Sequence, residues 1–512
     1  MSRQLTLALI AFLAAFTLGS TPAWAGKKND TLIYTSEREE PNIDVWYNSS
    51  REGIVVSRMI WDQLVYRDPK DMSYKPHLAT KWRWINDKAI EFTLRKGVKF
   101  HNGEKFDADD VKFSLEFLAD PANKTIARRG REYIESVDKL GSHKVRVNLK
   151  VVTPHILEYF SSSDFMIYPN EYYGKVGNKG MDLKPVGTGP YRATFVDPGK
   201  IAKLERFDGH FNGSAKGKGK IKNIVWKTIP DKNTQVAELL TGGVDWIWRV
   251  NPDQAKNLKR NPNLTVVGSE TMRIGYVGMD AAGRSGDTPM KKLKVRQAVS
   301  HAVNREAMAK NLAGGGARVI HVACFPTQFG CDDSGAPRYE YNQAKAKKLL
   351  AEAGYPNGFS IDLYAYRERP YAEAIIGYLH EVGIKAKLKY LKYKALRGKV
   401  RGDSDKSETS LLFMTWGSGS VNDISAITSH FFKFSSDDLY RDEKVRDWLQ
   451  KGDTTVDPKV RAANYKKALT QIAKQAYWLP LYTWSMNYAY TKDLDFKATT
   501  DEIPRFVNAS WK

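Results

Sequence analysis

The sequence predicts an α/β protein with more than one folding unit, and three observations support this class. Residues 79–118 predict strand, turn and helix, because Ile90, Phe92 and Leu94 alternate with polar residues before apolar positions recur at helical spacing. Strand-like segments at 361–366 and 386–390 flank a helical one, as in a β-α-β unit. The 512 residues suffice for several domains of about 100–200 residues. No repeat or linker separates them, so we expect the chain to cross between units.

The first 25 residues predict an export signal. Arg3 is followed by an apolar run at 5–18 and by the run A-W-A at 23–25, which has the form of a signal-peptidase site. The apolar run is short for a membrane span of about 20 residues, so we prefer a signal peptide cleaved after Ala25 to a membrane anchor. The mature protein is therefore expected to be exported and soluble.

The chain has two cysteines, Cys324 and Cys331, both in the part expected to be exported. Disulfides form in such compartments, and the two residues are seven positions apart, so we predict a local disulfide. Two thiols cannot supply the four ligands of a structural zinc site, and no histidine pair at ligand spacing lies near them. No metal site and no cofactor are expected.

The charge is strongly basic, with a formal net value of +22. Such a charge affects solubility and association rather than fold. Nucleic-acid binding is not expected, because no recognition motif accompanies the basic residues. A solvated basic surface is the simplest interpretation, and attraction of an anionic solute or of anionic envelope surfaces is the alternative.

Motifs of secreted hydrolases are absent from the sequence, namely G-x-S-x-G, H-E-x-x-H and S-x-x-K with its S-D-N and K-T-G partners. The carboxylate pair Asp109 and Asp110 is explained by a helix that begins after Asp107, where acidic side chains favour the helix dipole. We therefore do not expect an enzyme. A secreted hydrolase is the alternative from a different functional class.

Four runs of sequence carry a resemblance to a known family. They are FTLRKGVKFHNGEKFDADDVKFSLE at 92–116, PVGTGPY at 185–191, VRQAVSHAVNRE at 295–306 and AKAKKLLAEAGYPNGF at 344–359. Together they closely resemble the signature of the family-5 extracellular solute-binding proteins, which are the dipeptide- and oligopeptide-binding components of ABC importers. Weaker similarity extends through the rest of the chain after residue 25.

The resemblance implies a two-lobed periplasmic binding protein of the cluster C type, with an extra subdomain in the first lobe. It implies a periplasmic monomer that closes on a small peptide-like, opine-like or oligosaccharide solute and delivers it unchanged to permease and ATPase subunits. The expected parts are residues 1–25 as signal peptide, 26–54, 186–270 and 483–512 as lobe I, 55–185 as its inserted subdomain, and 271–482 as lobe II.

The resemblance also indicates ligand-binding residues. In peptide-binding relatives, a Trp at a strand end is followed three residues later by an Asp that pairs with the ligand's α-ammonium group. Trp416 matches the Trp, but the third position after it is Gly419, so a bound free amine lacks its partner at a cost of about 1–3 kcal/mol. Ser418 offers a neutral hydrogen bond instead. An anionic or hydroxyl-rich solute suits Gly419 and the arginine candidates described next better than a free amine does. The alternative is a true di- or oligopeptide receptor that uses Asp423 for the amine.

A second candidate stretch resembles the R-P-Y run with which dipeptide-binding relatives hold the ligand's carboxylate. It contains Arg369, a proline and Tyr371, at the expected start of a helix. The spacing to the following Val-Gly is shorter than in the relatives, so Arg367 is also a candidate to face the cleft. Arginine binds carboxylates in a bidentate manner, and a helix N-terminus favours anions. Trp46 and Tyr47 are weaker candidates, because the first loop reaches the cleft in the family.

Overall fold

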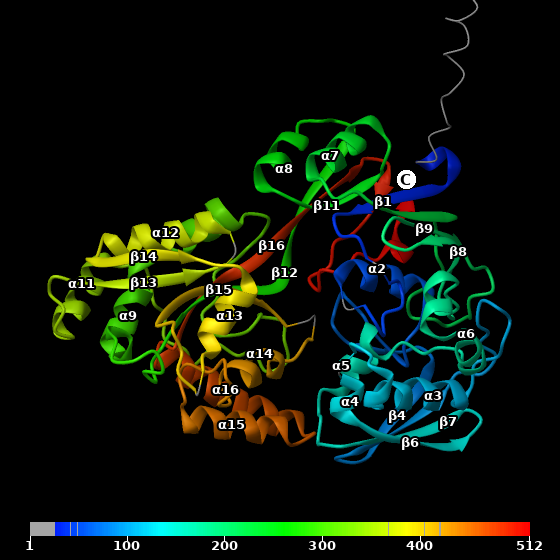
Figure 1. The fold of residues 1–512 in the computed structure, drawn as a ribbon, viewed down its shortest axis with the longest axis horizontal. Coiled ribbons are helices and arrows are strands. Elements are labelled where there is room, and N and C mark those ends of the chain that lie inside the picture. Colours follow the sequence, from blue (N-terminus) through cyan, green and yellow to red (C-terminus); the bar gives the residue numbers. More distant parts are fainter. Residues whose placement is uncertain are drawn as a thin grey trace, which may run out of the picture.

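The structure is a computed structural model that describes residues 26–512 except 41, 49, 128, 367, 404, 419 and 420. Two bodies lie side by side and share one long sheet (Figure 1). This arrangement confirms the expected two-lobed α/β fold. The expected signal peptide, residues 1–25, lies outside the described residues.

A mixed sheet of ten strands runs through both lobes. In spatial order its strands are β14 (Ile384–Tyr390), β13 (Phe359–Ala365), β15 (Leu411–Gly417), β12 (Leu264–Met279), β16 (Trp478–Thr491), β11 (Trp246–Val250), β1 (Thr31–Ser36), β10 (Asn223–Thr228), β9 (Ile201–Arg206) and β8 (Tyr191–Asp197). The first three strands belong to lobe II and the last five to lobe I (Figure 1).

The antiparallel strands β12 and β16 carry the sheet from one lobe to the other (Figure 1). Their register slips between Thr271 and Ile274 and again between Gly275 and Tyr276. Such bulges bend a strand and increase its twist. After the first slip β12 also pairs with β15. We therefore propose that the chain enters lobe II near residue 271 and returns to lobe I near residue 483.

The inserted subdomain has its own antiparallel sheet beneath lobe I (Figure 1), formed by β4 (Ala79–Asn86), β5 (Ala89–Leu94), β7 (Lys144–Leu149) and β6 (Ile134–Gly141). The helix α3 (Ala108–Ala119) covers the sheet. Asp107 caps α3, and Asp107 and Asp110 form a reciprocal capping box. The alternation that predicted β5 is confirmed, because Ile90, Phe92 and Leu94 are buried in the core.

The remaining helices of lobe I and its subdomain are α2 (Arg51–Ile60), α4 (Arg129–Tyr133), α5 (Ile156–Phe160), α6 (Asn170–Leu183), α7 (Lys232–Thr241) and α8 (Pro252–Leu258). Short strand pairs complete this part of the chain: β2 (Val65–Arg67) with β3 (Tyr74–Pro76), and β17 (Leu494–Asp495) with β18 (Ser510–Trp511).

In lobe II the predicted β-α-β unit is confirmed, because β13 and β14 are parallel neighbours joined by α12 (Arg369–His380). The other helices are α9 (Leu293–Ala302), α10 (Arg305–Met308), α11 (Gln343–Glu352), α13 (Tyr393–Arg401), α14 (Ser425–Phe431), α15 (Glu443–Asp453) and α16 (Pro458–Lys474). The predicted disulfide between Cys324 and Cys331 is present. Across the described ranges, no helix has the length and apolar character needed to cross a membrane.

Candidate functional site

The face of lobe II that lies toward lobe I presents an aromatic side chain at the end of a central strand. Trp416 is the penultimate residue of β15 and is half-buried. Its indole stacks on the His430 imidazole with ring centroids 4.7 Å apart, and it meets Phe431 edge-on at 5.0 Å. Both partners lie on α14. These contacts fix the indole in one orientation on the wall of a cavity between the lobes.

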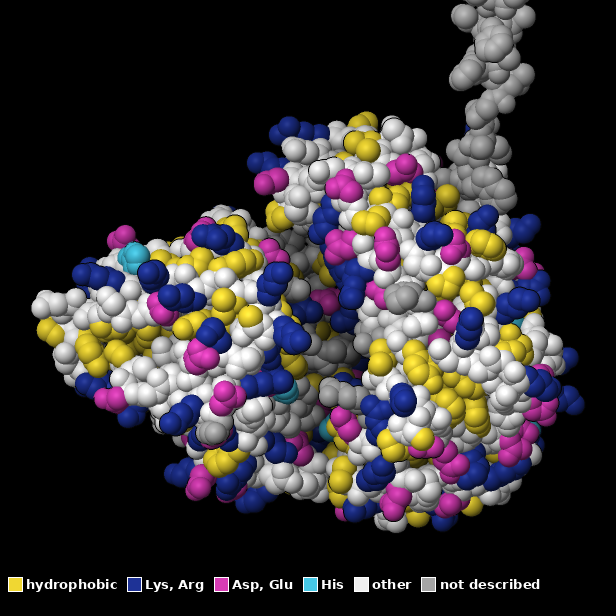
Figure 2. Space-filling view, in the orientation of Figure 1, with side chains coloured by type: hydrophobic (Ala, Val, Ile, Leu, Met, Phe, Trp, Pro, Cys, Tyr) yellow, Lys and Arg dark blue, Asp and Glu magenta, His cyan; other side chains and the backbone are white. Residues whose placement is uncertain are grey.

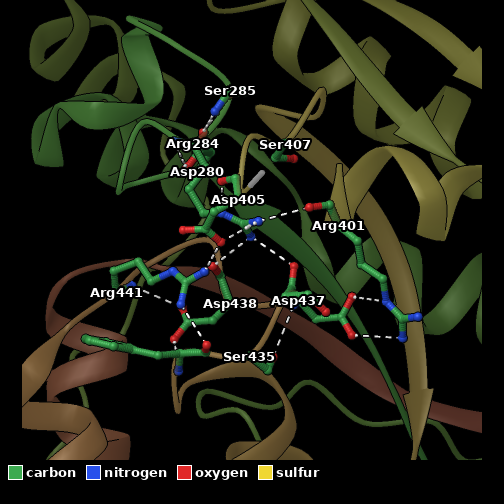
Figure 3. A network of polar contacts seen from close by, with 12 residues as sticks. Asp280, Arg284, Ser285, Arg401, Asp405, Ser407, Ser435, Asp437, Asp438 and Arg441 are labelled. Atoms are coloured by element: carbon green, nitrogen blue, oxygen red, sulfur yellow. Dashed lines mark hydrogen bonds and ion pairs between the residues drawn. The ribbon is translucent and has the colours of Figure 1, made fainter. Parts of the chain in front are cut away.

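A network of polar contacts holds the His430 ring in position. The Asp437 carboxylate lies 2.9 Å from His430 Nε2 and pairs with Arg401. Arg284 donates to the backbone carbonyls of Arg401 at 3.1 Å and Asp438 at 3.0 Å (Figure 3). Burial alone would raise the pKa of Asp437, but hydrogen bonds from His430 and Arg401 bring it below its usual value. The ionised Asp437 carboxylate therefore holds in place the His430 ring on which Trp416 stacks.

The opposite wall of this cavity comes from the subdomain and is also aromatic. Tyr133 and Tyr159 stack with centroids 5.2 Å apart, and His155 meets Tyr159 edge-on at 5.3 Å. The Arg129 guanidinium lies 4.1 Å from the centroid of the Tyr159 ring, which is cation–π geometry. The two walls enclose about 860 Å³, a size that accepts a small organic solute. We call this space the large cavity.

A smaller cavity of about 210 Å³ adjoins it, and Arg129 lines both. Three further arginines line the smaller cavity, namely Arg51 and Arg58 of α2 and Arg67 of β2. We call it the arginine chamber. Figure 2 shows Lys and Arg side chains gathered along the groove between the two bodies. The chamber therefore presents hydrogen-bond donors and positive charge to whatever enters the groove.

Two carboxylates, Glu158 and Asp164, also line the arginine chamber. Asp164 pairs with Arg129 at 3.0 Å, and Glu158 pairs with Arg67. Lobe II contributes Val421, so the chamber is closed by both lobes. Four guanidinium groups and two carboxylates leave the lining with an excess of positive charge.

The predicted ligand residues after Trp416 have different environments. Ser418 lines the large cavity, but its hydroxyl already donates to the Val421 carbonyl at 3.0 Å. Asp423 is buried, and its carboxylate accepts from Arg461 at 2.7 Å and from the Ser425 backbone at 3.0 Å. The Asp423 carboxylate is therefore already occupied by protein donors. Gly419 lies outside the described residues.

The second predicted stretch lies on another side of the cleft. Tyr371 stacks on Trp484 at 5.1 Å and donates its hydroxyl to the Leu312 carbonyl at 2.8 Å. It lines a third cavity of about 590 Å³ between the lobes, together with Arg249 and Arg273. Arg369, at the start of α12, points to solvent with its side chain 61% exposed and pairs with Glu373. Arg367 lies outside the described residues.

The two aromatic residues of the first loop are separated in the structure. Trp46 is fully buried between Phe117 and Tyr168, with centroid distances of 4.9 and 4.0 Å. It belongs to the subdomain core and has no surface for a solute. Tyr47 is partly exposed at a small pocket and donates its hydroxyl to the Asn123 carbonyl at 2.9 Å.

Sequence reasoning missed the arginine chamber and the tyrosine wall. One signal was available, because Arg51 and Arg58 are seven residues apart and so share one face of a helix. α2 begins at Arg51, so both arginines belong to this helix. Among the described residues, no group of three or more His, Cys, Asp or Glu side chains could hold a metal ion.

Comparison with known proteins agrees with this architecture. The model of the bacterial extracellular solute-binding proteins, family 5 (middle), matches residues 73–438. Glutathione-binding protein GsiB of Salmonella paratyphi A is 29% identical over 442 residues, covering 83% of each chain.

Solved structures show the same fold. HbpA2 from Haemophilus parasuis superimposes with a TM-score of 0.82 at 23% identity, over 94% of this chain and 100% of that one. A dipeptide-binding protein from Pseudoalteromonas sp. SM9913 in complex with Met-Leu gives 0.73 at 22% identity over the same shares. The family match spans more than two thirds of the sequence, and the chain therefore belongs to the bacterial extracellular solute-binding proteins of family 5.

Proposed function

We propose that this protein is the periplasmic substrate-binding component of an ABC importer, which captures a small solute between its lobes and delivers it unchanged to a permease. Proteins of this family bind small solutes and work with the permease and ATPase subunits of ABC transporters. The observation that carries the proposal is the large cavity, whose walls come from both lobes. A solute that contacts Trp416 and Tyr159 together binds the closed arrangement better than an open one, so its binding favours closure.

We further propose that the solute is anionic and peptide-like. The arginine chamber supplies positive charge, and the two carboxylates that line it are already paired with arginines. One relative is a glutathione-binding protein and another is a dipeptide-binding protein in complex with Met-Leu, and both compounds carry free carboxylates. A receptor that uses Asp423 for a ligand amine receives less support, because Arg461 already occupies that carboxylate.

The export and assembly of the chain follow from the same proposal. We propose cleavage after Ala25, release into the periplasm and action as a monomer. No chemical step is assigned to the protein, because its function needs only binding and release. Mass spectrometry of the solute recovered after binding should return the unchanged compound, and any turnover contradicts this part of the proposal.

Thermal-shift screening of the mature protein tests the proposal, since a ligand that binds only the folded state raises the melting temperature. The panel contains glutathione, dipeptides, opines and neutral oligosaccharides. We expect stabilisation by at least one solute and roughly tenfold weaker binding in Trp416→Ala. Trp82→Ala is the matched control, because Trp82 is half-buried on β4 of the subdomain and lines neither of the two cavities. Equal effects of the two substitutions would remove Trp416 from the binding site.

A further inference from the structure

We propose that the arginine chamber binds an acidic end group of the solute, and that Arg58 is its anchor, so that the solute class is an elongated compound with a carboxylate or phosphate terminus. This inference rests on the proposed function and specifies which chemistry the cleft selects. The four arginines of the chamber differ in how other groups of the protein compensate their charge.

Arg58 is 8% exposed, and within the described part of the chain it has no carboxylate within ion-pair distance. Its Nε is buried without a hydrogen-bond partner, and its Nη2 makes one long contact of 3.4 Å with the Ser161 carbonyl. Burial and the neighbouring Arg505 guanidinium lower the pKa of Arg58 to about 9, and Asp501 offsets this only in part. The side chain is a cation without its own counter-ion.

Two other buried arginines also lack a carboxylate partner in the part of the sequence that the structure describes, but backbone carbonyls accept hydrogen bonds from their guanidinium groups. Arg296 is 3% exposed, and it donates to the carbonyls of Met290, Lys291 and Gln475 at 2.8–2.9 Å. Arg305 is 6% exposed and donates to three carbonyls at 2.7–3.0 Å. Buried guanidinium groups need such partners, because a lost hydrogen bond is not replaced by water. Arg58 has donors that a bound anion can satisfy.

The other three arginines of the chamber each have at least one acidic partner that fixes their position. Arg51 pairs with Glu502 at 3.2 Å, Arg129 with Asp164 at 3.0 Å, and Arg67 with Glu158. An anion that enters therefore meets one uncompensated guanidinium and three oriented ones. Charge-assisted hydrogen bonds of this kind are the strong ones, and arginine's planar fork matches carboxylate and phosphate oxygens.

The dimensions of the two cavities indicate the shape of the solute. The chamber, at about 210 Å³, accommodates an acidic end group, whereas the adjoining cavity of about 860 Å³ accommodates the rest of a small molecule. Arg129 lines both spaces and lies over the Tyr159 ring. A solute with its acidic end in the chamber and its body between Tyr159 and Trp416 fills both.

The test uses matched probes on the mature wild-type protein at constant ionic strength. Glutathione, with two carboxylates, is compared with its diethyl ester, and glutarate is compared with inorganic phosphate to separate the two kinds of acidic group. We expect at least one acidic probe to raise the melting temperature, and we expect esterification to abolish this stabilisation. If no acidic probe raises the melting temperature, or if glutathione and its ester bind equally well, the proposal is overturned.

Substitution separates a binding role for Arg58 from a structural one. Arg58→Gln should weaken binding of the acidic probe roughly tenfold or more, yet the ligand-free melting temperature should not fall, because an uncompensated buried charge is removed. The matched control Arg296→Gln should lower the melting temperature and leave affinity unchanged. Arg129→Gln, at a less buried position, should also weaken the binding of acidic probes. This variant replaces Arg58→Gln in the test if Arg58→Gln does not fold.

The outcomes distinguish this inference from the proposed function. If neutral peptides or oligosaccharides bind and Trp416→Ala weakens them, the protein is a solute receptor but the chamber does not select acids. If acidic probes bind wild type and Arg58→Gln equally, Arg58 is not the anchor. If no solute of any class binds, the proposed function itself fails.

Discussion

The backbone N–H of Asn422 in lobe II donates a hydrogen bond of 2.6 Å to the carboxylate of Glu158 in the subdomain. Glu158 is 3% exposed, accepts from the Tyr74 hydroxyl at 2.5 Å and pairs with Arg67. One buried carboxylate thus serves three donors, and one of them belongs to the other lobe. The contact lies at the lining of the arginine chamber, so closure of the lobes and completion of the chamber are linked.

Replacing Glu158 should therefore loosen the lobes as well as destabilise the fold. Glu158→Gln keeps the side-chain size but removes the charge that pairs with Arg67, and breaking a buried pair costs about 3 kcal/mol. We expect a lower melting temperature and a larger radius of gyration in small-angle scattering of the ligand-free protein. Glu205→Gln is the control, because Glu205 pairs with Arg192 at the surface, where such pairs contribute under about 1 kcal/mol. An unchanged scattering profile in Glu158→Gln would show that this contact does not hold the lobes.

The disulfide supports the same inter-lobe segment. Cys324 and Cys331 close a loop of eight residues, and within it the Phe329 backbone N–H donates to the Asn422 carbonyl at 3.0 Å. In the chain-entropy model a loop of this size contributes about 2.5 kcal/mol. Replacing both cysteines by serine should lower the melting temperature and weaken solute binding. Reducing the wild-type protein should reproduce both effects, whereas reductant should leave the double variant unaffected. Identical melting of reduced and oxidised wild type contradicts this prediction.

Asp423 should prove structural rather than ligand-binding. Its pair with Arg461 is buried, and Arg461 also donates to the Tyr465 hydroxyl at 2.9 Å. Asp423→Ala leaves Arg461 buried without its partner, so we expect a loss of about 3–5 kcal/mol in the free energy of unfolding. Asp332→Ala, which removes an exposed pair with Lys466, should cost under about 1 kcal/mol.

The amine preference of the wild-type protein provides a second measurement on Asp423. If its carboxylate is occupied by Arg461, free and N-acetylated forms of one acidic peptide should bind with dissociation constants within about threefold of each other. A free amine favoured by about a hundredfold or more, roughly 3 kcal/mol, would indicate a charged partner in the cleft and restore the peptide-receptor reading.

Local sequence patterns predicted much of the fold, because the features that determine it act over short distances. The alternation at Ile90–Leu94, the cap at Asp107 and the cysteine spacing each concern residues within one turn, strand or loop. The family resemblance supplied the two-lobed arrangement and brought attention to Trp416, which lies on a cavity wall as a binding residue requires.

The arginine chamber could not be predicted in this way. Its arginines come from α2, β2 and α4, and they meet only when these three elements, separated along the chain, pack together. The same applies to Asp423, whose partner Arg461 is 38 residues away on α16. Trp46 was a weaker candidate because the first loop reaches the cleft in the family, but Phe117 and Tyr168, far along the chain, enclose it. In each of these examples, the role of the residue depends on partners that only tertiary packing brings near it.

A buried carboxylate in lobe I should reduce stability as the pH rises. Asp245 is 5% exposed and accepts from the Ile33 backbone at 2.8 Å. When a residue precedes Gly26, burial raises the pKa of Asp245 to about 6, although hydrogen bonds from the Ile33 and Gly26 backbones lower it in part. The prediction is made for a protein that keeps such a residue, because cleavage after Ala25 places a charged α-amino group beside this carboxyl. An unfolded aspartate titrates near about 3.9. Between these values the unfolded chain has lost its proton while the folded protein still holds it, so the free energy of unfolding falls with rising pH, by up to about 3 kcal/mol.

Asp245→Asn removes this titration and keeps an oxygen that can accept from Ile33. The melting temperature of the variant relative to wild type should therefore increase between about pH 4 and about pH 6 and stay constant above that range. Asp231→Asn is a control of opposite sign, because hydrogen bonds from the Thr234 backbone and hydroxyl lower the pKa of the exposed Asp231, and its contribution is lost as the pH falls. Parallel pH profiles for Asp245→Asn and wild type would mean that the Asp245 carboxyl does not titrate between these pH values. The two variants together separate the effect of burial, which raises the pKa of Asp245, from that of helix capping, which lowers the pKa of Asp231.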